Sequence, residues 1–392
     1  MQKPPSLVKA FLRLFDFVFF VSGFSFLLTG FDKTKGFALL PNKVRIQEAH
    51  VALEFTGAYR YPQPRADWLA RQREEIIDPD LPIIDAHHHI WQQDGNPYGL
   101  ADLAEDTGSG HRIVGTVFVE AHSSYRPDGP EALRPVGETE SIEAMLAANP
   151  ELAVRGLCRG IVGKADLTLG AQVAEVIAAH RAASPDRFRG IRHLVTRDPH
   201  FPNGIALRPS PEGLLKRLDF RDGLTEVARA GLTFDAMLYH SQISDLAEVA
   251  RLIPDLTIVL DHFGAPLGVG PYTDRRDDVL RHWQLAIREL AKCPNVVIKL
   301  GGQGMIISGD FWHERDTPPG SAELAAAWQP LFDTCIAAFG PDRCMFESNF
   351  PVDKGMFSYT VVWNAFKRLA SGASASEKAT LFHDTASRIY RL

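Results

Sequence analysis

The sequence predicts an α/β protein built as a (β/α)8 barrel of the TIM-barrel type. Short apolar runs alternate with segments of helical apolar spacing about eight times over roughly 320 residues, which is typical of a parallel sheet. Polar side chains stand at the C-terminal ends of these runs, where such barrels build their active sites. No GxGxxG or Walker glycine loop follows the first run, so a nucleotide-binding sheet is disfavoured.

The predicted strands are rich in Val, Ile, Leu and Phe, as expected for strands that are buried on both faces. They cover residues 81–85, 113–120, 153–163, 187–195, 232–239, 256–262, 295–302 and 343–350. Helical spacing of apolar residues predicts helices between them. Examples are residues 141–149, 170–183, 244–253, 277–293 and 322–339, with closing helices over 359–370 and 376–392.

The first strand carries the strongest chemical signal, in the run LPIIDAHHHIW at residues 81–91. Asp85, His87 and His89 are spaced by two, so on a strand they point to one side while His88 faces the other. One carboxylate and two imidazoles are therefore expected to converge. Two neutral imidazoles suit zinc or a similar divalent ion; the alternative is that they only form hydrogen bonds.

The other strand ends also carry titratable or amide side chains. Because the C-terminal strand ends of a barrel meet at one rim, we expect these side chains to surround a common cavity. The set comprises His87, His89, Glu120, His122, Arg192, His193, His240, Asp261, His262, Lys299, Glu347 and Asn349.

Composition excludes several function classes. The 392 residues are 45% hydrophobic and 23% charged, which is ordinary for a globular protein, and the net charge of −6 gives no reason to expect nucleic acid as a partner. Four scattered cysteines predict free thiols in a reducing, cytoplasmic compartment. We expect a small-molecule substrate; the sequence leaves a homo-oligomer open.

The N-terminus departs from this composition, because residues 10–31 are strongly apolar. A membrane anchor and a signal peptide are two interpretations. The favoured third is that residues 1 to about 60 stem from an upstream translation start and are not native to the protein. A membrane partner, and a membrane-anchored location, are expected only if the segment is a true anchor. We divide the chain into an apolar extension, residues 1–63, and a barrel, residues 64–392.

Several motifs in order along the chain resemble the amidohydrolase superfamily, and more narrowly its amidohydrolase-related, lactonase-type branch. The resemblance spans roughly residues 64–392. It rests on the HxH of strand one, RFRGIRH at 187–193, LYH at 238–240, LDHFG at 260–264, CPNVVIKLGG at 293–302 and FESNFPVD at 346–353.

The resemblance implies a distorted (β/α)8 barrel, hydrolysis at a carbonyl centre, and a metal site made by His87, His89, His240 and His262 for one divalent ion, zinc or manganese. Asn349 stands where the superfamily has an aspartate, and an amide is a poorer ligand and cannot act as a base. Because the branch includes members that work without a metal, a metal-independent mechanism stays open, with the histidines as hydrogen-bond donors to the oxyanion.

Three carboxylates could accept the proton of the attacking water: Asp353, Asp261 and Glu347. We favour Asp353, because a turn at Pro351 can bring it back over the barrel mouth. Asp353, Asp261 and His240 form the predicted catalytic set, and Asp261 has the alternative role of fixing an imidazole.

Arg192 is placed to clamp a substrate carboxylate, with a structural ion pair as the alternative. Glu120, Asn349 and Tyr125 complete the predicted substrate-binding residues. The expected function is hydrolysis of a carbonyl ester, specifically a lactone. The alternatives are a metal-dependent decarboxylase or an amidase of the same superfamily, or a non-catalytic binding barrel.

Overall fold

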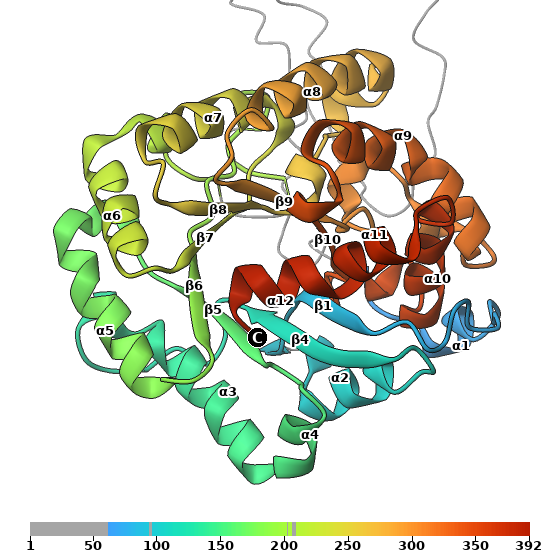
Figure 1. Ribbon diagram of the computed structural model, residues 1–392, viewed down its shortest axis with the longest axis horizontal. Helices are drawn as coiled ribbons and strands as arrows, with labels where there is room; N and C mark the ends of the chain where they lie inside the picture. Colours follow the sequence, from blue (N-terminus) through green and yellow to red (C-terminus); the bar gives the residue numbers. More distant parts are fainter. Residues whose placement is uncertain (1–61, 94–95, 202, 206–208) are drawn as a thin grey trace, which may run out of the picture. The chain divides into compact units, whose positions relative to one another are not determined.

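The computed structural model describes residues 62–93, 96–201, 203–205 and 209–392, and there it forms the expected barrel (Figure 1). Eight parallel strands follow the order β1-β4-β5-β6-β7-β8-β9-β10. The His89 N–H donates to the Phe350 carbonyl at 2.7 Å, which links β1 to the segment after β10 and nearly closes the sheet. The strands are β1 (Ile83–His88), β4 (Ile113–Val119), β5 (Gly160–Lys164), β6 (Phe188–Arg192), β7 (Thr233–Ala236), β8 (Thr257–Leu260), β9 (Val296–Leu300) and β10 (Cys344–Phe346).

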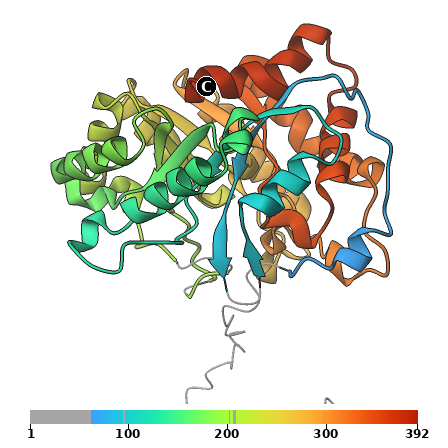
Figure 2. The same ribbon diagram turned by 90° about the horizontal axis from the view of Figure 1, so that it is seen from below.

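Helices surround the sheet, and a short antiparallel ribbon of β2 (Trp91–Gln93) and β3 (Asn96–Tyr98) projects from the end away from α12 (Figure 2). The apolar segment 10–31 lies outside the described residues, and the boundary at residue 63 stays a prediction. The helices are α1 (Ala66–Leu69), α2 (Leu100–Thr107), α3 (Val136–Ala148), α4 (Pro150–Val154), α5 (Val173–Ala183), α6 (Leu218–Arg229), α7 (Ile243–Leu252), α8 (Arg276–Leu290), α9 (Ser321–Phe339), α10 (Tyr359–Leu369), α11 (Ala375–Ala379) and α12 (Thr385–Tyr390).

The barrel interior has an apolar floor beneath a polar layer. Since side chains alternate along a strand, residues two apart point the same way. Val259 is followed by Asp261, Val297 by Lys299 and Met345 by Glu347, so polar groups stand above apolar ones. Residues of α12, which lies across the barrel opening, complete this apolar floor (Figure 1). Its members are Ile84, Ala86, Val117, Val119, Val162, Val259, Val297, Met345, Ala386, Ile389 and Tyr390.

A β-bulge in β1 corrects one expectation. Asp85 pairs with Thr116 but His88 pairs with Phe118, so β1 has one extra residue there. Asp85 therefore does not join the two histidines. Its Oδ1 accepts the Ser348 N–H at 2.8 Å and its Oδ2 accepts the Tyr359 hydroxyl at 2.9 Å. His88 faces away as expected, with its Nε2 at 2.8 Å from Thr116 Oγ1.

Two further expectations concern cysteines and membranes. All four cysteines are buried and free, which confirms the predicted thiols. Within the described ranges, no helix combines the length and apolar character needed to cross a bilayer.

Gly223 of α6 tests how tightly the outer helices pack. A Cβ at this position would lie 2.2 Å from the Leu167 carbonyl oxygen. Gly223→Ala gains up to about 1 kcal/mol from helix propensity, but relief of the overlap costs about 1–3 kcal/mol. We expect a lower melting temperature by differential scanning calorimetry. Asp222→Ala, at an exposed position of the same helix, is the control and should not lower it. Equal or higher stability of Gly223→Ala would show that the contact yields without cost.

Candidate active site

A cavity of about 40 Å³ lies at the C-terminal end of the barrel. Four polar residues predicted for the site line it together: His89, Arg192, His262 and Asn349, which come from four different strand ends. The rest of the wall is formed by apolar and aromatic side chains. That part comprises Leu194, Met237, Tyr239, Met305, Ile307 and Val352.

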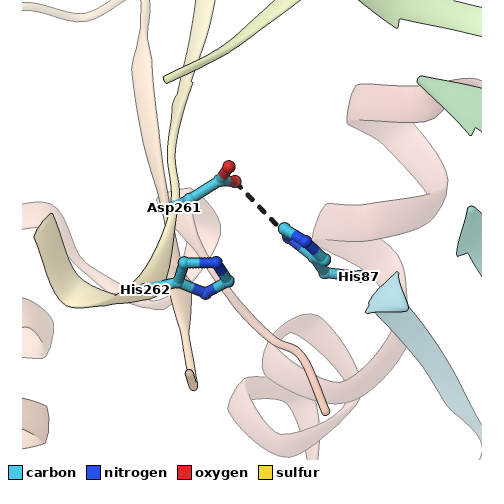
Figure 3. Close-up of side chains that lie close together, drawn as sticks. All are labelled: His87, Asp261 and His262. Carbon is cyan, nitrogen blue, oxygen red and sulfur yellow. Dashed lines mark ion pairs between the residues drawn. The ribbon is translucent and has the colours of Figure 1, made fainter. Parts of the chain in front are cut away.

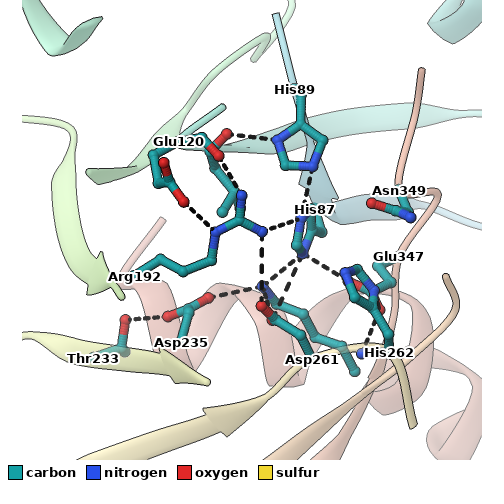
Figure 4. Close-up of polar contacts among 12 residues, drawn as sticks. His87, His89, Glu120, Arg192, Thr233, Asp235, Asp261, His262, Glu347 and Asn349 are labelled. Carbon is teal, nitrogen blue, oxygen red and sulfur yellow. Dashed lines mark hydrogen bonds and ion pairs between the residues drawn. The ribbon is translucent and has the colours of Figure 1, made fainter. Parts of the chain in front are cut away.

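His87 and His89 face each other through their Nε2 atoms, which are 3.2 Å apart (Figure 4). The His89 Nδ1 lies 2.8 Å from the Val119 carbonyl, so it donates there and leaves a lone pair on Nε2. The His87 Nδ1 lies 2.9 Å from Glu347 Oε2, an acceptor that likewise favours a lone pair on Nε2. Burial, followed by Lys299 for His87 and by Arg192 for His89, lowers the pKa of both imidazoles well below its usual value. Both rings are therefore neutral, as metal ligands must be.

The spacing of this donor pair fits one metal ion, with the Arg192 Nη1 3.3 Å from the His87 Nε2. Two nitrogens that are each about 2.0–2.1 Å from a tetrahedral zinc lie about 3.3 Å from each other, close to the observed 3.2 Å. A second group of possible ligands, His87, Asp261 and His262, has ligand atoms within 4.8 Å of one another (Figure 3). There, however, the Lys299 ammonium already lies 3.0 Å from Asp261 Oδ1 and 3.2 Å from His87 Nδ1.

Glu347 holds two histidines at once. Its Oε1 accepts from the His262 Nδ1 at 2.7 Å and the His262 backbone N–H at 3.0 Å, and its Oε2 faces His87. Burial would raise the pKa of Glu347, but His262 and His87 outweigh it and lower this pKa to about 2. Burial would also raise the pKa of Asp261, but Lys299 lowers it below the usual value. Both groups are therefore ionised and serve to orient their neighbours.

Glu120 positions Arg192. The Arg192 Nε donates to Glu120 Oε1 at 2.8 Å and its Nη2 to the Glu120 carbonyl, while Nη1 lies 3.3 Å from His87 Nε2. Glu120 is fully buried and its second oxygen lies 3.1 Å from His122 Nδ1. The Tyr125 ring stacks on His122 at 5.8 Å. Neither Glu120 nor Tyr125 is among the described residues that line the cavity.

Asp353 lies directly behind Asn349. The Asn349 Nδ2 donates to Asp353 Oδ1 and the Gly304 N–H to Oδ2, both at 2.8 Å. Burial outweighs these bonds and raises the pKa of Asp353 to about 7. Asn349 and His262 both have left-handed backbones, with φ of 54° and 56°, a strain that concentrates at functional sites.

His240 is placed apart from the other histidines. Its Nδ1 accepts the Leu267 N–H at 3.4 Å, and its ring lies 5.3 Å from the Tyr272 ring. It lines a separate cavity of about 450 Å³ beside α7 and α8 and not the one shared by His89 and His262.

One residue close to the site was missed. Asp235 of β7 is fully buried and binds the Lys299 ammonium at 2.7 Å. The signal was present in the sequence: Asp235 is a charged residue inside the apolar run 232–239, two positions after Thr233, whose hydroxyl it accepts at 2.8 Å.

Comparisons with known proteins agree with this architecture. The amidohydrolase family model matches residues 84–392. An uncharacterized protein of Sinorhizobium fredii, y4mH, is 33% identical over 328 residues, which are 80% of this chain and 99% of that protein. An L-fucono-1,5-lactonase of Burkholderia multivorans is 28% identical and is covered to 96%, against 79% of this chain. A crystal structure of a Burkholderia multivorans amidohydrolase with bound HEPES has a TM-score of 0.59 at 25% identity and covers 79% of this chain and 99% of its own. The chain therefore belongs to the amidohydrolase family and is a hydrolase.

Proposed function

We propose that the protein opens a lactone by attack of water on the ring ester. The observation that carries this proposal is the shared cavity of His89, Arg192, His262 and Asn349, with a carboxylate of raised pKa behind it. The relative named L-fucono-1,5-lactonase, which aligns with 79% of this chain, supports a ring ester as the substrate.

The histidine pair fits one divalent ion, zinc or manganese. His87 and His89 would hold it through Nε2. Burial would lower the pKa of His262, but Glu347 outweighs burial and raises this pKa above its usual value, so His262 is not counted as a ligand. When bound, such an ion polarises a carbonyl and lowers the pKa of its water.

Asp353 is the proposed proton acceptor. Water adds to the ester carbonyl carbon while Asp353 takes its proton, and the Arg192 Nη1 donates to the developing oxyanion. The ring carbon–oxygen bond then breaks, Asp353 returns the proton to the leaving oxygen, and a hydroxy acid is released. Asn349 keeps Asp353 in place through its 2.8 Å hydrogen bond.

A panel of lactones, simple esters and aromatic carboxylic acids tests the reaction class. Lactone ring opening, measured through the proton that the product acid releases, supports the proposal. Carbon dioxide release would replace it with a decarboxylase, and saturable binding without turnover would replace it with a binding protein.

His87→Ala should lower kcat/KM for the best lactone at least roughly a hundredfold, the scale of losing one oxyanion or metal group. His240→Ala is the matched control, because His240 lines a different cavity, and it should retain most activity. If the two substitutions cost the same, the assignment of the cavity is wrong.

The pH dependence tests Asp353. As a base it must be ionised, so kcat/KM should rise with pH through about 7. Asn349→Ala removes a donor that favours the charged carboxylate, so the acidic limb should move to higher pH. Asp353→Asn should lower kcat/KM at least roughly a hundredfold.

Asp198→Asn, at another buried aspartate that accepts the Tyr272 hydroxyl, should keep the acidic limb in place. A wild-type limb far below pH 7, or one that persists in Asp353→Asn, would remove Asp353 from this role.

Metal content is expected to reach at most one divalent ion per chain, because an amide at Asn349 weakens a two-ion site. Elemental analysis of the purified, dialysed protein measures it. His89→Ala should lower the retained ion, since one of the two facing nitrogens is lost. Two equivalents per wild-type chain would contradict the one-ion site.

A further inference from the structure

Three buried polar residues connect the barrel floor to the site; we name Tyr390, Asp235 and Lys299 the buried column. The Tyr390 hydroxyl donates to Asp235 Oδ2 at 2.6 Å. The same oxygen accepts from the Lys299 ammonium at 2.7 Å, and this ammonium lies 3.2 Å from His87 Nδ1. All three residues of the column are fully buried. A chain of short contacts therefore runs from α12 to the histidine pair.

Stability alone does not explain the column, because burying paired charges typically stabilises a protein less than a well-packed apolar core of the same volume does. The floor residues around Tyr390 are all apolar. The Lys299 ammonium donates to Asp235 Oδ2 at 2.7 Å and lies 3.0 Å from Asp261 Oδ1. Its 3.2 Å contact with His87 Nδ1 acts electrostatically, because the proton on Nδ1 faces Glu347. The position of the ammonium is thus fixed by its partners, and Asp235 is the partner at the shortest distance.

Tyr390 in turn fixes Asp235. The other carboxylate oxygen, Oδ1, accepts the Thr233 hydroxyl at 2.8 Å, so two hydroxyl donors hold the carboxylate from two elements. Without the Tyr390 hydroxyl, Oδ2 would keep Lys299 as its only described hydrogen-bond donor. The carboxylate would then draw the ammonium more strongly, away from His87.

We propose that Tyr390 is a positioning residue for the hydrolytic site: through Asp235 it sets where the Lys299 ammonium lies against His87. This inference rests on the proposed function, because His87 is taken as a member of the active site. Groups that orient such ligands from behind typically change activity about 10–100-fold when lost.

Tyr390→Phe tests the column, because the ring stays in the floor and only the hydroxyl is removed. We expect kcat for the best lactone to fall about tenfold, with little change in KM. The ¹⁵N signals of the His87 imidazole, assigned by their loss in His87→Gln, should also shift.

The chain supplies a matched control. The Tyr98 hydroxyl donates to Asp106 Oδ2 at 2.7 Å, and Lys354 binds the same oxygen at 2.7 Å. The ammonium also lies 5.2 Å from the Tyr98 ring centre, comparable to 5.5 Å for Lys299 and Tyr390. Tyr98→Phe therefore removes an equivalent bond that does not lead to His87, and it should leave kcat and the His87 signals unchanged.

The outcomes separate this inference from the proposed function. Wild-type kcat and unshifted His87 signals in Tyr390→Phe overturn it, as does an equal loss in Tyr98→Phe. If the wild type turns over no lactone, the proposed function fails. The His87 imidazole signals in Tyr390→Phe would still show whether Tyr390 positions Lys299 against His87. Should Tyr390→Phe not fold, Thr233→Val removes the other hydroxyl on Asp235 and is judged by the same two measurements.

Discussion

Charge pairing inside the barrel is the constraint on which the rest of the site depends. Glu120, Asp235, Asp261 and Glu347 are completely removed from solvent, and an isolated buried carboxylate would be too costly to keep ionised. Each of these carboxylates has a cation or an imidazole as its partner. Glu120 pairs with Arg192, the two aspartates pair with Lys299, and Glu347 pairs with His87 and His262. Arg192 and His262, which line the cavity, are therefore each held in place by a fully buried carboxylate.

The fold could be predicted from the sequence because apolar periodicity is a local signal. Each of the eight predicted runs overlaps one strand. Most strands are shorter than their runs, but β1 continues three residues past residue 85. In the run 153–163, α4 ends at Val154 and turn residues precede β5. The polar rim was predictable for the same reason, since it follows the strand ends. His89, Arg192, His262 and Asn349 do meet at one cavity.

Other features of the site depend on contacts between distant parts of the chain, and a local apolar pattern carries no information about such contacts. The bulge that turns Asp85 away is a property of how β1 pairs with β4. His240 follows its strand as expected, yet the short helix it begins sets it toward Tyr272. The partnership of Asp235 with Tyr390 joins residues 155 positions apart.

The backbone at Asn349 limits what the missing aspartate can mean. With φ at 54°, this position lies in the left-handed region that asparagine and aspartate both tolerate far better than branched residues do. Sterics therefore do not impose the amide. An amide has N–H groups that a carboxylate lacks, and here the Asn349 amide donates a hydrogen bond to Asp353. The carboxylate nearest to this position is therefore Asp353, four residues further along the chain, and the Asn349 amide lies between it and the cavity.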